Sequence, residues 1–410
     1  MSSLLDRFLR YVKVDTRAVE EAGKYPSSDG QFDLGKILKK ELQDLGLSDI
    51  SVDKWGIVMG TIPGTVNGAP TIAWCSHMDT SPEFTATHLK PQIVKNYNGK
   101  DIVLPGDKSR VIRVDETPGM ADLKGKTLIT TDGTTLLGAD DKAGIAVIMT
   151  ATNELMSNRR IKHGPIRVLF TCDEEIGHGC EKLDLKNIDA QVAYTCDGEG
   201  EGGLENETFS ADLATVTITG KNIHPGYGKD VMINAIRLAG QFLSRMPWQR
   251  LSPEKESGRD GFLHPYIIEG GVPEVKIRIL LRSFVTADLK DEAKILRNVA
   301  ATIMAEFPGA KVDVKVQKQY RNMFEYLAKE PRAVKLAGKA IQNAGMEPKF
   351  QSIRGGTDGS RLSEMGLPTP NLSVGMHNFH SPLEFACLDQ MENAVKVLVE
   401  LAKLWGKEKK

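Results

Sequence analysis

The sequence contains few cysteines and no long apolar run. Its five cysteines are odd in number and scattered along 410 residues, which argues against a disulfide framework and for a reducing compartment. The amino-terminal residues carry charges at Asp6, Arg7, Arg10 and Lys13 and lack the apolar core of a signal peptide. The sequence contains no stretch of about 18 apolar residues, the length that is needed to cross a bilayer. These absences predict a cytoplasmic protein whose cysteines act as small buried packing residues.

An excess of charge of either sign is also missing. Lysine and arginine number 53 against 54 acidic residues, and the net charge is −1. Without a basic stripe or an acidic tail, we expect neither nucleic acid nor a membrane as a partner. The sequence leaves the oligomeric state open between a monomer and a homodimer.

The length and the order of the expected elements predict two domains. A chain of 410 residues exceeds the roughly 250–300 residues at which a single core stops growing. Apolar strand-like runs alternate with helical stretches in the first half, which predicts an α/β domain with a central, mostly parallel sheet flanked by helices. The helices of this domain are expected at 30–46, 141–155, 330–344 and from Asp389 onward.

The pattern changes near residue 206, which indicates an inserted domain. The order there is strand, helix, strand, strand, helix, strand, typical of a βαββαβ sandwich of the α+β class. These elements are expected at 213–220, 232–246, before Gly270, and at 275–284, 287–306 and 311–316. The predicted division is a first part of the α/β domain at 1–205, an inserted lid or dimerisation domain at 206–318, and a second part at 319–410.

Three strand-like runs in the α/β domain end abruptly in acids or histidine. The carboxyl ends of strands in such sheets are where ligands collect, so these side chains predict a site. The runs and the residues that follow them are 71–76 with His77 and Asp79, 166–171 with Asp173, Glu174 and Glu175, and 192–196 with Asp197 and Glu199.

Histidine and carboxylate side chains with a position left open for water are the ligands of hydrolytic zinc. Two histidines and three carboxylates suffice for two zinc ions if each metal takes one histidine and one terminal carboxylate while Asp140 bridges. Glu174 is then free to take a proton from the water between the metals. Asp79 can accept a hydrogen bond from the imidazole and fix its tautomer. The five candidate ligands are His77, Asp140, Glu175, Asp197 and His380.

Four short motifs together resemble the M20 metallopeptidase family over nearly the whole chain. They are Ser76-His77-Met78-Asp79-Thr80, the run Gly138 to Gly144 (GADDKAG), Asp173-Glu174-Glu175-Ile176-Gly177, and His380-Ser381-Pro382. The resemblance implies that His77 and Asp197 hold one zinc and Glu175 and His380 the other, with Asp140 bridging. It also implies a cis peptide between Asp140 and Asp141, Glu174 as general base and Asp79 as the residue that orients the histidine.

Two features indicate a member that releases the amino-terminal residue from tripeptides. One is Cys196-Asp197-Gly198-Glu199, and the other is the 63-position spacing from His77 to Asp140, with a polar loop at about 84–125 between them. The alternatives are a dipeptidase, a carboxypeptidase or an N-acyl amino acid deacylase with the same metal chemistry. A non-catalytic member that uses the cleft for binding is the remaining hypothesis.

The expected substrate contacts lie on the inserted domain and near the glycine-rich turn. The resemblance implies that His224 stabilises the oxyanion of the tetrahedral intermediate. Arg282 or Arg354 could bind the peptide carboxylate bidentately, although each could instead make an ordinary surface ion pair. Asn234 is expected to position substrate, while His178 is interpreted as structural and His377 as a loop residue.

Overall fold

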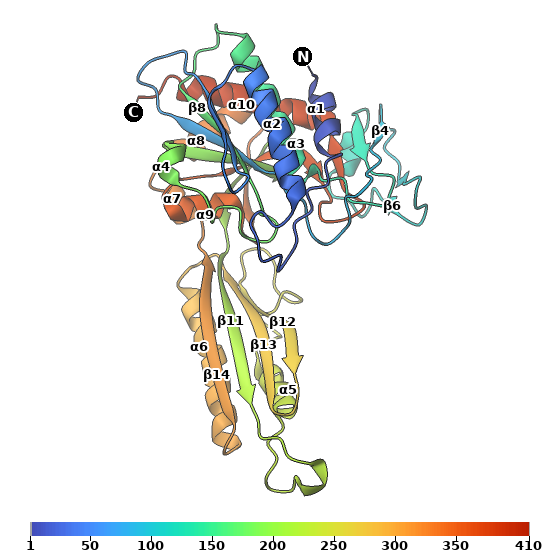
Figure 1. The fold of residues 1–410 in the computed structure, drawn as a ribbon, viewed down its shortest axis with the longest axis vertical. Helices are drawn as coiled ribbons and strands as arrows, with labels where there is room; N and C mark the ends of the chain where they lie inside the picture. Colours follow the sequence, from blue (N-terminus) through green and yellow to red (C-terminus); the bar gives the residue numbers. More distant parts are fainter. Residues whose placement is uncertain (1, 410) are drawn as a thin grey trace. The chain divides into compact units, whose positions relative to one another are not determined.

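The computed structural model describes residues 2–409, which form two compact units (Figure 1). The first unit runs to Asn206 and also contains Met323–Ser352 and the chain from Thr357 onward. The second unit consists of Glu207–Asn322 with Ile353–Gly356. No helix within residues 2–409 is long and apolar enough to cross a membrane.

A mixed sheet forms the centre of the first unit. Its strands run in the order β1-β2-β8-β3-β9-β16-β17-β7-β4, and β10 pairs with both β15 and β16. The four central strands β8, β3, β9 and β16 pair in parallel, whereas β1, β2, β17, β7 and β4 pair antiparallel, so the sheet is mixed and less parallel than the sequence pattern suggested. The strands are β1 (Ser48–Val52), β2 (Val58–Ile62), β3 (Ile72–His77), β4 (Gln92–Val94), β7 (Leu128–Thr130), β8 (Ile166–Thr171), β9 (Val192–Glu199), β10 (Gly203–Thr208), β15 (Lys349–Ile353), β16 (Asn371–His377) and β17 (Phe385–Cys387).

Helices cover the sheet on both faces, so β3 is buried at all six positions. The long helix α3 packs on β3, β9 and β16 with α10 and α1 beside it. On another part of the sheet, Ala73, Cys75 and Ala193 pack with Leu362 of α9 and with Ile188 of α4. The expected helices are confirmed, with bounds that differ by one to three residues. The helices are α1 (Leu4–Tyr11), α2 (Asp29–Asp44), α3 (Ala139–Ser157), α4 (Leu185–Ile188), α7 (Phe324–Leu327), α8 (Arg332–Asn343), α9 (Asp358–Met365) and α10 (Leu388–Trp405).

The segment expected as a polar loop at about 84–125 has structure of its own, so that interpretation was wrong. It contains β4, the two-residue strands β5 (Ile102–Val103) and β6 (Val111–Ile112), and the short 3-10 helix η1 (Met120–Leu123). Its scattered apolar residues include Tyr97, Leu104 and Met120, and they form a small core with Phe385 of β17. The apolar residues were too widely spaced to reveal this core, because they meet only through tertiary contacts.

The second unit has the predicted βαββαβ order. Its four strands pair antiparallel in the order β12-β13-β11-β14. The two helices pack on this sheet and share one hydrophobic core with it, so the strands are buried mainly at alternate positions. The elements are β11 (Ser210–Thr219), α5 (Ala235–Arg245), β12 (Phe262–Gly270), β13 (Glu274–Ser283), α6 (Asp288–Glu306) and β14 (Lys311–Tyr320), with a 3-10 turn η2 at Pro225–Tyr227.

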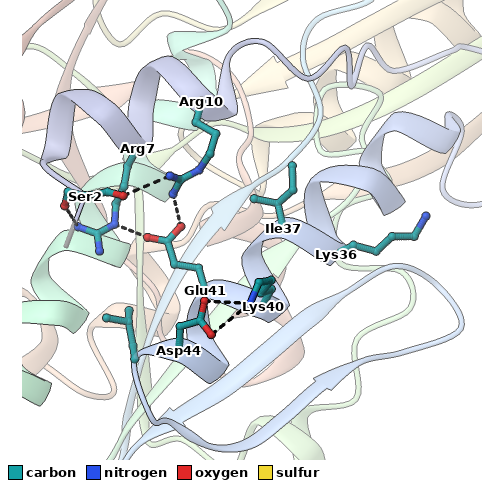
Figure 2. Close-up of a pocket in the computed structure, with 9 residues that line it drawn as sticks. Ser2, Arg7, Arg10, Lys36, Ile37, Lys40, Glu41 and Asp44 are labelled. Atoms are coloured by element: carbon teal, nitrogen blue, oxygen red, sulfur yellow. Dashed lines mark hydrogen bonds and ion pairs between the residues drawn. The ribbon is translucent and has the colours of Figure 1, made fainter.

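Glu41 joins α1 to α2 through three contacts, and Figure 2 shows the two with Arg7 and Arg10. Its carboxylate lies 2.5 Å from Arg7 Nε and 2.5 Å from Arg10 Nη2, and it accepts a hydrogen bond of 2.6 Å from the Tyr11 hydroxyl. Glu41 and the two arginines line a pocket of about 560 Å³, together with Lys36, Lys40 and Asp44. Because the two arginines are already paired with Glu41, we interpret this pocket as a structural junction.

Replacing Glu41 tests this junction. The Arg7 side chain is 2% exposed, so Glu41→Ala leaves a buried charge without its partner, a loss that costs about 3–5 kcal/mol. We expect amide hydrogen exchange in α1 and α2 to accelerate by roughly 100-fold, measured by mass spectrometry. The matched control is Asp44→Ala, which removes an exposed ion pair with Lys40 and should cost less than about 0.5 kcal/mol. Equal exchange in the two variants would contradict the assignment.

Candidate functional site

The five expected ligands converge at the carboxyl edge of the central sheet of the first unit. His77 is the last residue of β3, Asp197 lies near the end of β9, and Glu175 follows β8. Asp140 lies in the first turn of α3, and His380 lies in the connection from β16 to β17. Elements that are far apart in the sequence therefore bring the five side chains together in one cluster.

Asp140 occupies the middle of this cluster. His77 Nε2 lies 2.9 Å from one oxygen of Asp140, and His380 Nε2 lies 3.3 Å from the other. On the outer sides, His77 Nε2 is 3.7 Å from Asp197 and His380 Nε2 is 2.8 Å from Glu175. The ligand atoms of His77, Asp140 and Glu175 are close enough together to hold a metal ion, and so are those of His77, Asp141 and Asp197.

The electrostatics of the cluster favour a cation. Although burial opposes it, the neighbouring carboxylates of Asp197 and Asp140 hold the pKa of His77 well above its usual range. Hydrogen bonds to Asp140 and Glu175 raise the pKa of His380 to about 11. Burial raises the pKa of Glu175 to about 7, and its Oε1 atom is buried without a hydrogen-bond partner. An unpartnered carboxylate oxygen among nitrogen and oxygen ligands fits a zinc-type ion, so the residues present suit a metal centre.

Asp141 belongs to the same cluster but has a different set of contacts. Its peptide bond with Asp140 is cis, as the resemblance implied. Its carboxylate accepts the backbone N–H of His77 at 3.3 Å and that of Gly144 at 3.2 Å. Both oxygens are therefore engaged with the main chain, which makes Asp141 a residue that orients His77.

Glu384 was not found from the sequence. Its buried carboxylate accepts the backbone N–H groups of Leu137, Gly138 and Asp140 at 2.7, 2.7 and 3.0 Å. Burial raises the pKa of this carboxyl to about 7, against the effect of the three donors. Glu384 lies four residues after His380. The segment 380–384 therefore contacts Glu175 through His380 and the backbone of Asp140 through Glu384. No local pattern marks it, because its partners lie 244–247 positions away in the chain.

Asp79 contacts both His77 and the acidic turn that follows β8. His77 Nδ1 lies 3.1 Å from the main-chain carbonyl of Asp79 and 3.5 Å from its carboxylate. The carboxylate instead accepts the backbone N–H groups of Glu174 and Glu175, both at 3.0 Å. The carbonyl is thus the closer acceptor for the imidazole, and the buried carboxylate holds the acidic turn after β8.

Glu174 lies in this turn, which is fixed from a second side. The carboxylate of Asp173 accepts hydrogen bonds from the backbone N–H and hydroxyl of Ser27 at 2.7 and 2.5 Å, and from Gln31 at 2.6 Å. Burial holds the pKa of Glu174 well above its usual range, and the buried carboxylate of Asp358 adds to the shift. A carboxyl whose pKa is raised is suited to accept and return a proton near neutral pH.

The expected substrate-binding residues lie on the second unit, and each has local contacts there. Arg282 is 9% exposed, donates to the carbonyls of Asp212 and Leu281, and stacks on Tyr320. Asn234 caps α5 by accepting the N–H of Ile236.

Of the remaining two residues of this set, Arg354 is half-buried and His224 is exposed. Arg354 donates to the carbonyls of Gly258 and Asp260, at 2.5 and 3.1 Å, and stacks on Phe209. His224 Nδ1 accepts the N–H of Gly226 at 3.2 Å. The roles of all four in substrate binding stay predictions.

Two other histidines were interpreted as structural or as loop residues. His178 makes a local contact of 2.6 Å with Glu181, and its side chain is 49% exposed. His377 is not a loop residue: it is the last residue of β16 and is 5% exposed, so that interpretation was wrong.

The α/β fold and the buried cluster of acids and histidines define a hydrolase with a candidate metal site. A sequence model described as peptidase family M20/M25/M40 matches residues 130–404. The chain belongs to this peptidase family. It is 45% identical over 403 residues to a protein named peptidase T from Geobacillus thermodenitrificans, with 98% of each chain covered.

Two solved structures show the same architecture. The aminopeptidase PepT from Bacillus cereus superposes with a TM-score of 0.78 at 25% identity, covering 98% of both chains. A tripeptidase from Staphylococcus aureus superposes with a TM-score of 0.77 at 26% identity, covering 99% of this chain and 98% of that one. The predicted fold class, an α/β domain with helices flanking a central sheet and an α+β insertion, is confirmed.

Replacing Asp79 tests whether its carboxylate fixes the turn that contains Glu174 and Glu175. An asparagine would keep one acceptor oxygen and lose the charge, so Asp79→Asn should accelerate exchange of the Glu174 and Glu175 amides by roughly 10-fold to 100-fold. Hydrogen-exchange mass spectrometry of the 170–178 peptide measures this. The matched control is Asp53→Asn, because Asp53 accepts two backbone N–H groups in a different turn. Unchanged exchange at 174–175 in Asp79→Asn would show that its carboxylate does not hold the turn.

Proposed function

We propose that this protein is a metallo-aminopeptidase that releases the amino-terminal residue from tripeptides with the help of two zinc ions. The observation that carries the proposal is the position of Asp140, whose two oxygens face two different histidines, each with a further carboxylate beside it. This arrangement suits two adjacent metal ions better than one. The relatives named peptidase T, aminopeptidase and tripeptidase support the substrate class.

The chain offers each metal one histidine and one terminal carboxylate. We assign His77 and Asp197 to one zinc, His380 and Glu175 to the other, and Asp140 to both. When bound, a zinc pair lowers the pKa of a shared water molecule and polarises the scissile carbonyl group. We propose zinc because histidine and carboxylate side chains are its usual ligands in hydrolases. Cobalt and manganese accept similar side chains.

Glu174 acts as the proton carrier in this proposal. Its backbone is fixed through Asp79, and its buried carboxyl has a raised pKa, so it can take a proton from the attacking water and give it to the departing amine. His224 is proposed to stabilise the oxyanion, and Arg354 or Arg282 to bind the peptide carboxylate, with Asn234 positioning the substrate. The five free, buried cysteines support a reducing compartment, and we propose the cytoplasm.

The nearest alternative functions keep the chemistry and change the substrate. A dipeptidase, a carboxypeptidase and an N-acyl amino acid deacylase differ in peptide length and in the need for a free amino terminus. After reconstitution with zinc, we expect trialanine to be cleaved at least about 10-fold more efficiently than dialanine, tetraalanine or N-acetyl-trialanine, as kcat/KM values measured by chromatography. Because either cleavage of trialanine gives alanine and dialanine, the end that is released is read from Ala-Gly-Leu; initial release of leucine, or preference for the acetylated peptide, would contradict the proposal.

Replacing Glu174 tests the proton-transfer step. We expect Glu174→Gln to lower kcat about 10²-fold to 10⁴-fold, because the amide cannot accept a proton. The metal content, measured by atomic emission, should stay at two ions per chain. The control is Glu181→Gln, which removes an exposed carboxylate a few residues away and should leave kcat unchanged. A Glu174→Gln variant that keeps its metals and its turnover rules out this assignment.

A further inference from the structure

A polar cavity separate from the pocket at Glu41 lies in the first unit, beside the ends of β9 and β16. It has a volume of about 590 Å³ and is lined on one side by Glu199 and Glu205 and on another by His377 and Gln390. Glu199 comes two residues after Asp197, and His377 comes three residues before His380. The cavity is therefore close in sequence to both halves of the cluster, although none of the five ligands lines it.

His377 presents an unused acceptor to this cavity. Its Nε2 lies 2.7 Å from the carbonyl oxygen Oε1 of Gln390, so Nε2 carries a proton and, in the neutral ring, Nδ1 carries a lone pair. The ring stacks on Phe385, with 4.7 Å between centroids, which fixes its orientation. Nδ1 is buried without a hydrogen-bond partner, and the Glu199 carboxylate lies 3.6 Å away. Two acceptors face each other at a distance that calls for a donor between them.

The remaining charges of the cavity are largely committed. Glu201 pairs with Lys126 at 3.1 Å and accepts a hydrogen bond from Asn393 at 2.9 Å. One oxygen of Glu205 accepts a hydrogen bond of 2.5 Å from Asn371. The excess of negative charge selects a cation and disfavours an anion such as the peptide carboxylate. The acids Asp122, Glu199, Glu201 and Glu205 outnumber the two lysines, Lys126 and Lys349, in the lining.

The geometry suits an ammonium group better than a metal ion. Among residues 2–409, no set of three ligand atoms close enough to hold a metal includes His377 or Glu199. A primary ammonium carries three donors and can serve both acceptors at once. Glu199 and Asp197 are alternate residues of β9, about 7 Å apart, so a substrate group beside Asp197 lies within about one side-chain length of Glu199.

We infer that the notch between His377 Nδ1 and Glu199 is a subsite for a primary ammonium group of the substrate peptide. The inference rests on the proposed peptidase function. The ammonium is either the α-ammonium of the first residue or the side-chain ammonium of an amino-terminal lysine, because both present the same three donors. Occupancy of this notch would give Nδ1 its missing donor and place a positive charge beside Glu199.

The first test is direct binding, which does not depend on catalysis. Propylammonium chloride is titrated into the metal-free, full-length protein, and the ring nitrogen resonances of His377 are followed by NMR. We expect a saturable shift of the Nδ1 resonance in the wild type that is lost in Glu199→Gln. The control is Asp115→Asn, which removes an exposed charge from outside the cavity and should keep the shift. No saturable shift in the wild type would overturn the inference, whether or not the protein cleaves peptides.

The second test identifies which ammonium binds. Kinetics are compared for trialanine, Lys-Ala-Ala and propionyl-Ala-Ala, which lacks the α-amine. If the α-ammonium binds, Glu199→Gln raises KM for both free-amine peptides roughly 10-fold to 100-fold with kcat nearly unchanged, and leaves propionyl-Ala-Ala unaffected. If the lysine ammonium binds, only Lys-Ala-Ala is affected. Equal KM values for wild type and Glu199→Gln on all three substrates would overturn the substrate role. A wild-type protein that cleaves no peptide refutes the proposed function and leaves the NMR titration to decide the subsite.

Discussion

The structure of the site depends on the concentration of buried negative charge at one edge of the central sheet. Asp140, Glu175 and Asp197 meet within a few ångströms, and Asp141 and Glu174 lie in the same region. Carboxyl groups this close must either take up protons or have positive charge between them. In the structure the two histidines supply positive charge, because the neighbouring carboxylates raise their pKa values. A pair of metal ions would compensate the same negative charge. The repulsion between these carboxylates therefore favours a bound cation as much as the presence of suitable ligand atoms does.

Carboxylates outside the ligand set keep this arrangement in place through the main chain. Asp79 accepts the backbone N–H groups of Glu174 and Glu175. Glu384 accepts the N–H groups of Leu137 and Asp140, and Asp141 accepts the N–H of His77. Backbone N–H groups can stabilise a buried carboxylate without adding a mobile side chain. His77, Asp140 and Glu175 are therefore fixed through their backbone N–H groups as well as through their side-chain neighbours.

The inferred ammonium subsite extends the same logic to the substrate. The notch at His377 and Glu199 has two acceptors and no donor, and Glu199 lies on the strand that also carries Asp197. An enzyme that acts only at a free amino terminus needs a way to recognise a positive charge close to its metals. A fixed acceptor pair would provide this recognition by hydrogen bonding and by charge together.

The sequence by itself determined the class of fold, the order of the inserted domain and the identity of the five clustered residues. Periodicity and strand ends are local properties, and His77, Glu175 and Asp197 each follow an apolar run that can be read directly. Only the tertiary structure decided the partners of Asp79, the contacts of Glu384, the unused acceptor of His377 and the small core that Tyr97 and Met120 form with Phe385. These depend on contacts between residues that are distant in the chain, and hydrogen bonds to the backbone N–H leave no signature in the order of side chains.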